Sequence, residues 1–445
     1  MNNFTRIVDN GKPRIVIIGG GFGGIELVKS LKKADVQVVL IDKHNHHTFQ
    51  PLLYQVATAG LEADSIIHPF RKCFEDQHNF YFRLGEVTHI NTEKKLVETT
   101  IGILRYDYLV IATGATTNYY GNEQIEKHAI PIKSIVDAIA LRNQILSNFE
   151  QALLIEDEEQ LNSLMDYVIV GGGPTGVEVA GALAELKKHV FHKDYKELDF
   201  VKMDIHLIEG TPRLLNGMSE EASQKALEFL KEFGVQVSLN RFVKSYDGYT
   251  VELDNGQKLI TKTLIWAAGV VGVPAPGISS ESILRGRRLK VDKYNRIESY
   301  ENIFAIGDIA GMTTEDTPRG HPMMAPVAMQ QGKLLGENLQ QLIKGKPLKP
   351  FKYNDQGSMA TVGRNKAVVD LKSFKTQGFF AWFIWMFVHL ISIVGYRNRL
   401  LVLINWMWSY FSYDKGIRLI VGSKKENNTV PRQAPASTSS QTTFS

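Results

Sequence analysis

Residues 14–43 read RIVIIGGGFGGIELVKSLKKADVQVVLIDK, and this stretch decides the fold. A short apolar run leads into Gly19, Gly21 and Gly24 at GxGxxG spacing, and a helical pattern and a second apolar run then end at Asp42. In such a βαβ unit the glycines permit a tight turn, close approach of a pyrophosphate, and close packing of helix on strand. The stretch therefore predicts a dinucleotide site, with Asp42 placed to accept hydrogen bonds from a ribose.

The same pattern recurs further along the chain. Gly171 follows Gly19 by 152 residues, and Gly171, Gly173 and Gly176 repeat the spacing in VGGGPTGVEVAGALAEL, before a second strand that ends at Glu209. The interval to Glu209 exceeds the usual ~20 residues, which we ascribe to a longer helix and a loop. Two copies predict an α/β fold with two Rossmann-type domains that bind two dinucleotides. One flavin and one nicotinamide would form a hydride pathway, whereas two nicotinamides would serve no purpose.

Three other segments favour sites near these units. Residues 44–66, HNHHTFQPLLYQVATAGLEADSI, fit a ligand-lining segment or an ordinary loop and helix equally well. A buried strand ends at Thr113 and Gly114, where the glycine would let the backbone pass close to the first nucleotide. Another strand is followed by Asp308, which fits either the sugar-alcohol chain of a flavin or a helix cap. The next helix is expected by Gln330, with its first turn directed toward the middle of the molecule.

The C-terminal segment differs in kind. Residues 379–394 read FFAWFIWMFVHLISIV, uncharged if His389 is neutral, and residues 400–411 read LLVLINWMWSYF. Neither run reaches the ~20 apolar residues of a membrane-spanning helix. Their tryptophans and tyrosine and the nearby arginines suit a membrane interface, which we favour over a buried helical pair or a dimer interface. Residues 423–445 are rich in Ser, Thr, Pro and Gln and are predicted to be disordered.

Composition excludes several classes of function. The chain of 445 residues suits two or three domains, and its net charge of +4 is too weak to indicate nucleic acid. Cys73 is the single cysteine, which excludes a disulfide framework and paired-cysteine redox chemistry. The N-terminus shows no apolar run of a secretory signal, so we expect the protein to stay inside the cell. We assign no metal site.

Together these motifs resemble the type II (non-proton-pumping) NADH:quinone oxidoreductases over about residues 13–420. The glycine motifs fit many flavoproteins, whereas FQPLLYQVATAGL and VHLISIVGYRNRLLVLINW are much more specific. The resemblance implies a second Rossmann-type domain inserted in the first and a membrane-associating, amphipathic C-terminal part. The expected boundaries are 12–125 and 290–350 for the FAD domain, 126–289 for the NADH domain, and 351–422 for the C-terminal part.

The resemblance also implies the site residues. FAD would be bound by Gly19, Gly20, Gly21, Phe22, Gly23, Gly24, Asp42, Lys43, Val87, Thr113, Gly114, Asp308, Ala328 and Met329. NADH would be bound by Gly171, Gly173, Gly176, Glu178 and Glu209, and the quinone would contact Gln50 and Gln330.

Two of these positions carry alternatives or departures. Glu178 is implied to be catalytic, although a carboxylate near a helix N-terminus is also favoured by the helix dipole alone. The family's AQxAxQ motif has Pro326 at its first glutamine position here, so one polar contact expected near the quinone is missing.

The implied activity is hydride transfer from NADH to FAD, followed by transfer of two electrons to a membrane quinone without proton pumping. Glu209 favours NADH over NADPH because it would repel a 2′-phosphate, whereas Arg213 nearby could bind one. The enzyme would sit as a peripheral protein on the cytoplasmic side of the inner cell membrane, and a homodimer is left open. The alternatives are a flavin-bearing, NADH-binding signalling or interaction protein, and a reductase with another acceptor.

Overall fold

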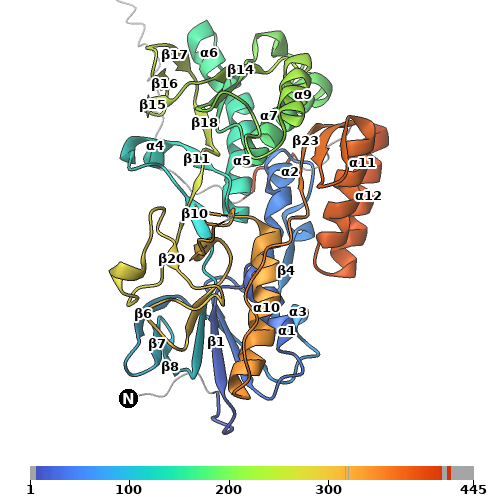
Figure 1. The fold of residues 1–445 in the computed structure, drawn as a ribbon. Helices are drawn as coiled ribbons and strands as arrows, with labels where there is room; N and C mark the ends of the chain where they lie inside the picture. The colour runs from blue at the N-terminus through green and yellow to red at the C-terminus, as the bar shows by residue number, and fades with distance from the viewer. Residues whose placement is uncertain (1–6, 316, 319, 413–417, 422–445) are drawn as a thin grey trace, which may run out of the picture.

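Two parallel sheets of five strands each organise the part of the chain that the computed structural model describes, residues 7–315, 317–318, 320–412 and 418–421. The predicted disordered tail at 423–445 lies outside these residues. The first sheet, low in Figure 1, has the order β21 (Ile303–Ala305), β9 (Tyr108–Ile111), β1 (Arg14–Ile18), β2 (Gln37–Asp42), β5 (Phe80–Leu84). The second, at the top, has the order β11 (Ile130–Pro131), β18 (Thr263–Trp266), β12 (Tyr167–Val170), β13 (Ile205–Glu209), β14 (Gln236–Leu239).

The two units repeat one another element by element. In each, a central strand leads into the helix after the glycines, α1 (Phe22–Ser30) or α7 (Pro174–Leu186), and then into the neighbouring strand. In each, a three-stranded antiparallel meander precedes the return to the sheet: β6 (Val87–Asn91), β7 (Leu96–Thr99) and β8 (Gly102–Arg105), or β15 (Val243–Tyr246), β16 (Thr250–Leu253) and β17 (Lys258–Ile260). Because β21 of the first sheet follows the whole second unit in the chain, the prediction of one Rossmann-type unit inserted in another is confirmed.

The long helices of the second unit pack on one face of its sheet with Ile169 and Leu207, whereas a short helix at Ile125 and the meander pack on the other face. The prediction that the interval between Gly176 and Glu209 holds a longer helix is confirmed, since α7 continues through a π-helical turn at Lys187–Phe191 into α8 (His192–Asp194). Ser134 begins the longest helix of this unit with a capping box that includes Asp137. The remaining helices are α4 (Glu123–His128), α5 (Ile135–Ala152), α6 (Glu158–Met165) and α9 (Glu220–Glu232).

A short antiparallel ribbon joins the two units. β10 (Ala115–Thr117) leaves the first unit and pairs with β19 (Val270–Gly272), which leaves the second. Beyond β19, Ala275 and Ile278 already pack in the core of the first unit, ahead of the predicted re-entry at residue 290. The first unit is completed by the strand pairs β3 (His46–Thr48) with β4 (Ile67–Pro69) and β20 (Leu289–Lys290) with β22 (Ala310–Gly311), and by the helices α2 (Leu53–Ala57) and α3 (Phe70–Cys73).

Helix α10 (Ala325–Ile343) packs closely along α1, as Figure 1 shows. A Cβ atom on Gly332 would collide with the carbonyl group of Gly23, so a glycine is needed for this approach. The prediction that the chain is helical by Gln330 is confirmed, because the helix begins at Ala325. Pro326 lies in the first turn, where a backbone N–H has no helical partner in any case, so proline fits there as a helix starter.

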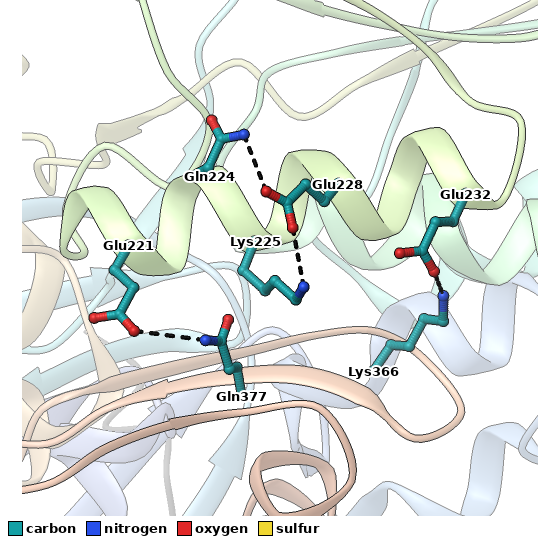
Figure 2. Close-up of polar contacts among 7 residues, drawn as sticks. All are labelled: Glu221, Gln224, Lys225, Glu228, Glu232, Lys366 and Gln377. Atoms are coloured by element: carbon teal, nitrogen blue, oxygen red, sulfur yellow. Dashed lines mark hydrogen bonds and ion pairs between the residues drawn. The ribbon is translucent and has the colours of Figure 1, made fainter.

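The C-terminal part is a three-stranded sheet followed by two helices: β23 (Ser358–Gly363), β24 (Lys366–Asp370), β25 (Lys375–Gln377), α11 (Phe379–Ser392) and α12 (Tyr396–Ser412). It packs on the second unit, where Gly181 of α7 has no side chain to block the carbonyl group of Val362. Figure 2 shows its polar contacts with α9, which include the ion pair between Lys366 and Glu232 and a hydrogen bond from Gln377 to Glu221.

Helices α11 and α12 each have one buried edge and one exposed apolar face. Ala381, Trp385 and Val402 are buried in a core shared with α2 and α7. The alternative of a buried helical pair therefore holds for these inner edges and fails for the outer faces, which are exposed. Phe380 is 71% exposed and Trp408 67% exposed. The other exposed apolar residues of these helices are Phe379, Phe383, Phe387, Val388, Ile391, Tyr396, Leu400, Ile404, Met407 and Phe411. Among the described residues, no helix combines the length and the apolar character needed to cross a bilayer.

Candidate functional site

The first glycine loop has the shape that a bound diphosphate needs. Gly19 has a φ of +102°, and a Cβ atom there would collide with the carbonyl group of Ala112. Gly24 likewise leaves room for the carbonyl group of Gly19, whereas no described atom lies within 4 Å of a Cβ atom placed on Gly21. The N-terminus of α1, which none of the described side chains caps, therefore faces open space with free N–H groups.

The second glycine loop repeats this geometry. Gly171 has a φ of +109° and lies against the carbonyl group of Ala267, and Gly176 lies against the carbonyl group of Gly171. A Cβ atom placed on Gly173 would again meet no described atom of another segment within 4 Å, and α7 begins directly after this glycine. Both glycine loops therefore share one backbone geometry, a tight glycine turn followed directly by a helix N-terminus.

The two predicted ribose acids occupy equivalent places. Asp42 accepts hydrogen bonds from the backbone N–H of Gly20 and of His44, each at 2.7 Å. Glu209 accepts from Gly172 and, at 2.6 Å, from Thr211. Each carboxylate is thus oriented by its own glycine loop, while its remaining lone pairs are available to ribose hydroxyl groups.

The other predicted FAD residues lie in several segments of the first unit. The ring of Phe22 meets His47 edge-on at 4.9 Å. Thr113 donates to the carbonyl group of Val273 at 2.6 Å, which ties the first strand end to the segment after β19. Gly114 has a φ of +68°. Gly23 and Ala328 are buried, whereas Lys43 and Met329 are exposed. Val87 lies on β6, two residues after Gly85, whose N–H donates to the carbonyl group of Asp42.

Lys133 connects two predicted site residues that are far apart in the sequence. Its Nζ lies 3.9 Å from Oδ2 of Asp308 and 3.3 Å from Oε1 of Gln50. Burial raises the pKa of Asp308, and the charges of Lys133 and Arg288 oppose that shift. Sequence analysis missed Lys133, although its place directly before the capping box of α5 fixes its position.

The two glutamines of α10 have different partners. Gln330, predicted as a quinone contact, pairs with both backbone groups of Asn354 at 2.9 Å. Gln331 accepts the N–H of Gly307 at 2.7 Å and so holds the turn that carries Asp308. Sequence analysis did not single out Gln331, because only the packing of α10 brings it to that turn.

Glu178 lies at a cavity between the second unit and the C-terminal helices. The cavity has a volume of about 110 Å³, and its aromatic lining comprises Tyr54, Trp382, Trp385, Trp406 and Tyr410. Burial raises the pKa of Glu178 to about 8, and a hydrogen bond from the backbone of Thr361 opposes the shift. Nε1 of Trp385 approaches this carboxyl group but makes no hydrogen bond of full geometry with any described atom. Glu178 is therefore mostly protonated at pH 7.

A chain of hydrogen bonds crosses one wall of this cavity. Nε1 of Trp406 donates to Gln55 at 2.7 Å, and Gln55 donates to the hydroxyl group of Tyr54 at 2.8 Å. Burial and the nearby charge of Glu178 raise the pKa of Tyr54 well above its usual value. Segment 44–66 thus contributes to the lining of this cavity. His389, which stacks on Trp385 at 4.1 Å, stays neutral because burial lowers its pKa to about 4.

Comparison with known proteins identifies relatives along most of the chain. A family model described as pyridine nucleotide-disulphide oxidoreductase matches residues 13–332, and one described as NDH2 C-terminal domain matches residues 356–412. The type II NADH:quinone oxidoreductase Ndh of Mycobacterium tuberculosis is 36% identical over 418 residues, which cover 91% of this chain and 89% of that protein.

Two further comparisons agree. The mitochondrial internal alternative NAD(P)H-ubiquinone oxidoreductase A1 of Solanum tuberosum is 31% identical, covering 89% of this chain and 86% of that protein. A solved structure of NDH2 from Plasmodium falciparum in complex with NADH matches with a TM-score of 0.84 at 22% identity, over 91% of this chain and 99% of that chain. At that identity the structural match supports the fold.

The raised pKa of Glu178 predicts a pH-dependent penalty on stability. Between its ordinary pKa of 4.5 and its value of about 8 in the folded protein, the unfolded chain loses this proton and the folded one keeps it, so the free energy of unfolding falls as pH rises. Glu178→Gln removes the effect, so its advantage in Tm over the parent should grow between pH 5 and pH 8, by several degrees for a penalty on the order of a few kcal/mol. Thermal unfolding of the flavin-loaded proteins across this range measures it, and an advantage that stays constant with pH contradicts the assigned shift.

Proposed function

The chain belongs to the family of type II NADH:quinone oxidoreductases, and on that premise we propose which of its residues carry the oxidation of NADH and the reduction of a quinone. One observation carries the proposal. Two copies of the same dinucleotide loop are joined by a short ribbon, and beside the second loop an aromatic cavity ends at Glu178. FAD, when bound, supplies the chemistry that accepts a hydride from NADH and returns two electrons to the quinone.

We assign FAD to the first unit. The free N–H groups of α1 suit its pyrophosphate, and Asp42 suits its adenosine ribose. Asp308, held on its turn by Gln331 and approached by Lys133, suits the sugar-alcohol chain. We keep the remaining predicted FAD residues as proposed contacts. We keep the proposed domain boundaries 12–125, 126–289 and 290–350, except that the chain re-enters the FAD domain at about Ala275.

We assign NADH to the second unit. Gly171–Gly176 and the N-terminus of α7 suit its pyrophosphate, and Glu209 suits the adenosine ribose. Arg213 bonds Asn216 at 3.0 Å and 3.2 Å, so its guanidinium group is already engaged beside Glu209. This arrangement favours NADH over NADPH.

We assign the quinone to the aromatic cavity and the protonated carboxyl group of Glu178 to proton supply there. Glu178 keeps a proton near pH 7 beside the cavity, which is where a quinone that gains two electrons takes up protons. Gln50 stays a proposed quinone contact. Gln330 would serve as one only after releasing the backbone of Asn354.

We place the protein on a membrane surface through α11 and α12. The exposed apolar side chains of these two helices are clustered rather than scattered singly, and a cluster of this kind marks an interaction surface. The same helices line the cavity. A lipid-soluble quinone would then enter from the bilayer, on the cytoplasmic side of the inner cell membrane. Paired-thiol chemistry has no support, because Cys73 is the single cysteine and burial raises its pKa to about 11.

The half-reactions test the proposed function directly. The purified protein should be yellow, NADH should bleach it in the absence of oxygen, and a short-chain quinone should restore the colour within one mixing time. Bleaching without reoxidation by quinone would favour the flavin-bearing signalling or interaction protein.

The nucleotide preference tests Glu209. Glu209→Gln should lower the ratio of kcat/KM for NADH over NADPH by about tenfold, because the repulsion of a 2′-phosphate is lost. Asp42→Asn is the matched control in the first unit, and its flavin-loaded form should keep the parent ratio. An unchanged ratio in Glu209→Gln would remove Glu209 from the specificity site.

Vesicle binding tests the exposed faces of α11 and α12. Phe383→Glu combined with Leu400→Glu should lower the fraction bound to anionic phospholipid vesicles by about tenfold or more, since both apolar side chains leave the interface. Leu154→Glu is the control, because Leu154 is an exposed leucine, more exposed than Phe383 or Leu400, that lies after α5 and outside the two helices. Equal loss of binding in both proteins, measured by sedimentation, would contradict attachment through the two helices.

A further inference from the structure

Tyr120 is an exposed aromatic residue in a backbone conformation that side chains disfavour. Its φ is +55°, in the left-handed region, and 67% of its surface is exposed. Exposing an aromatic ring to water is unfavourable, and a residue in a strained backbone conformation persists only where its surroundings fix it.

The surroundings of Tyr120 do fix it. Its hydroxyl group donates to the carbonyl group of Ala268 at 2.8 Å, and its N–H donates to the side chain of Asn118 at 2.9 Å. Nε1 of Trp266 donates to the carbonyl group of Asn118 at 2.8 Å. A Cβ atom on Gly269 would lie 2.6 Å from the Tyr120 hydroxyl oxygen, so this approach depends on a glycine at the strand end. The ring is therefore rigidly placed over the end of β18.

The strand order locates this ring on the path of NADH. Glu209 ends β13, the loop of Gly171 ends β12, and Ala268 follows β18, which is the order β13, β12, β18 across the sheet. The ribbon of β10 and β19 then leads from β18 to Gly114 at the first unit. A dinucleotide that runs from Glu209 over the loop toward the flavin must pass the end of β18. The hydroxyl group of Tyr120 also feels the charge of Glu209, which adds to burial in raising its pKa.

We propose that Tyr120 is an NADH-binding residue whose ring packs against the nicotinamide-ribose half of the dinucleotide as it crosses from the pyrophosphate loop toward the flavin. This deepens the function proposed above and rests on it. The ring is held in place before NADH binds, so binding costs little side-chain conformational entropy at Tyr120.

The test compares NADH with AMP, which carries only the adenosine half. Tyr120→Asn removes the ring, and asparagine tolerates the left-handed backbone, so the variant separates the ring from the strain. In flavin-loaded full-length protein, the apparent Kd for NADH, taken from the concentration dependence of anaerobic flavin bleaching, should rise about tenfold. The inhibition constant of AMP should stay within about twofold. Tyr120→Phe keeps the ring, and its Kd for NADH should stay within about threefold of the parent.

Two results would overturn the proposal. One is an unchanged Kd for NADH in Tyr120→Asn, which would show that the ring does not touch the dinucleotide. The other is a loss of AMP affinity in proportion to that of NADH, which would show general damage to the site or a contact with the adenosine half. A failure of the proposed function is distinct from both, because the parent protein itself would then not bleach with NADH.

Discussion

A hydrogen bond between a glycine loop and the carboxylate that ends the neighbouring strand is the constraint on which both cofactor sites depend. Gly20 donates to Asp42 in the first unit, and Gly172 donates to Glu209 in the second. Each bond fixes the loop against its sheet while the glycines let backbone pack on backbone. The helix N-terminus that follows is left facing open space with its N–H groups free, and the same carboxylate stays beside that space for a ribose.

The repeat also explains why the two cofactors can meet. The second unit is inserted in the first, and the chain enters and leaves it through β10 and β19, which pair with each other. Thr113 and Val273 are bonded just beyond this ribbon. The two strand ends that would border the cofactors are thereby held together, and in the proposed arrangement NADH runs along the second sheet toward the flavin. The ring of Tyr120 stands over the last strand that this path crosses.

The C-terminal helices border the cavity at Glu178 on one side and expose an apolar face on the other. Its inner edge fills a core shared with α2 and α7 and buries Glu178, whose carboxyl group keeps a proton near neutral pH. Its outer edge exposes a run of large apolar side chains on both helices. One pair of helices therefore forms a wall of the cavity and the apolar face outside it, which is the arrangement that the proposed entry of a quinone from lipid requires.

The sequence alone determined the two glycine units, their terminal acids Asp42 and Glu209, and the apolar C-terminal runs. These depend on local chemistry, such as a glycine turn, a strand-end acid or a periodic apolar face, that neighbouring residues encode directly. Only the tertiary structure brought Lys133 between Asp308 and Gln50, Gln331 to Gly307, and Tyr54 with Trp406 to the cavity at Glu178. Those contacts join residues tens to hundreds of positions apart, and it is packing between units, rather than any local pattern, that decides them. Packing likewise engaged Gln330 with Asn354.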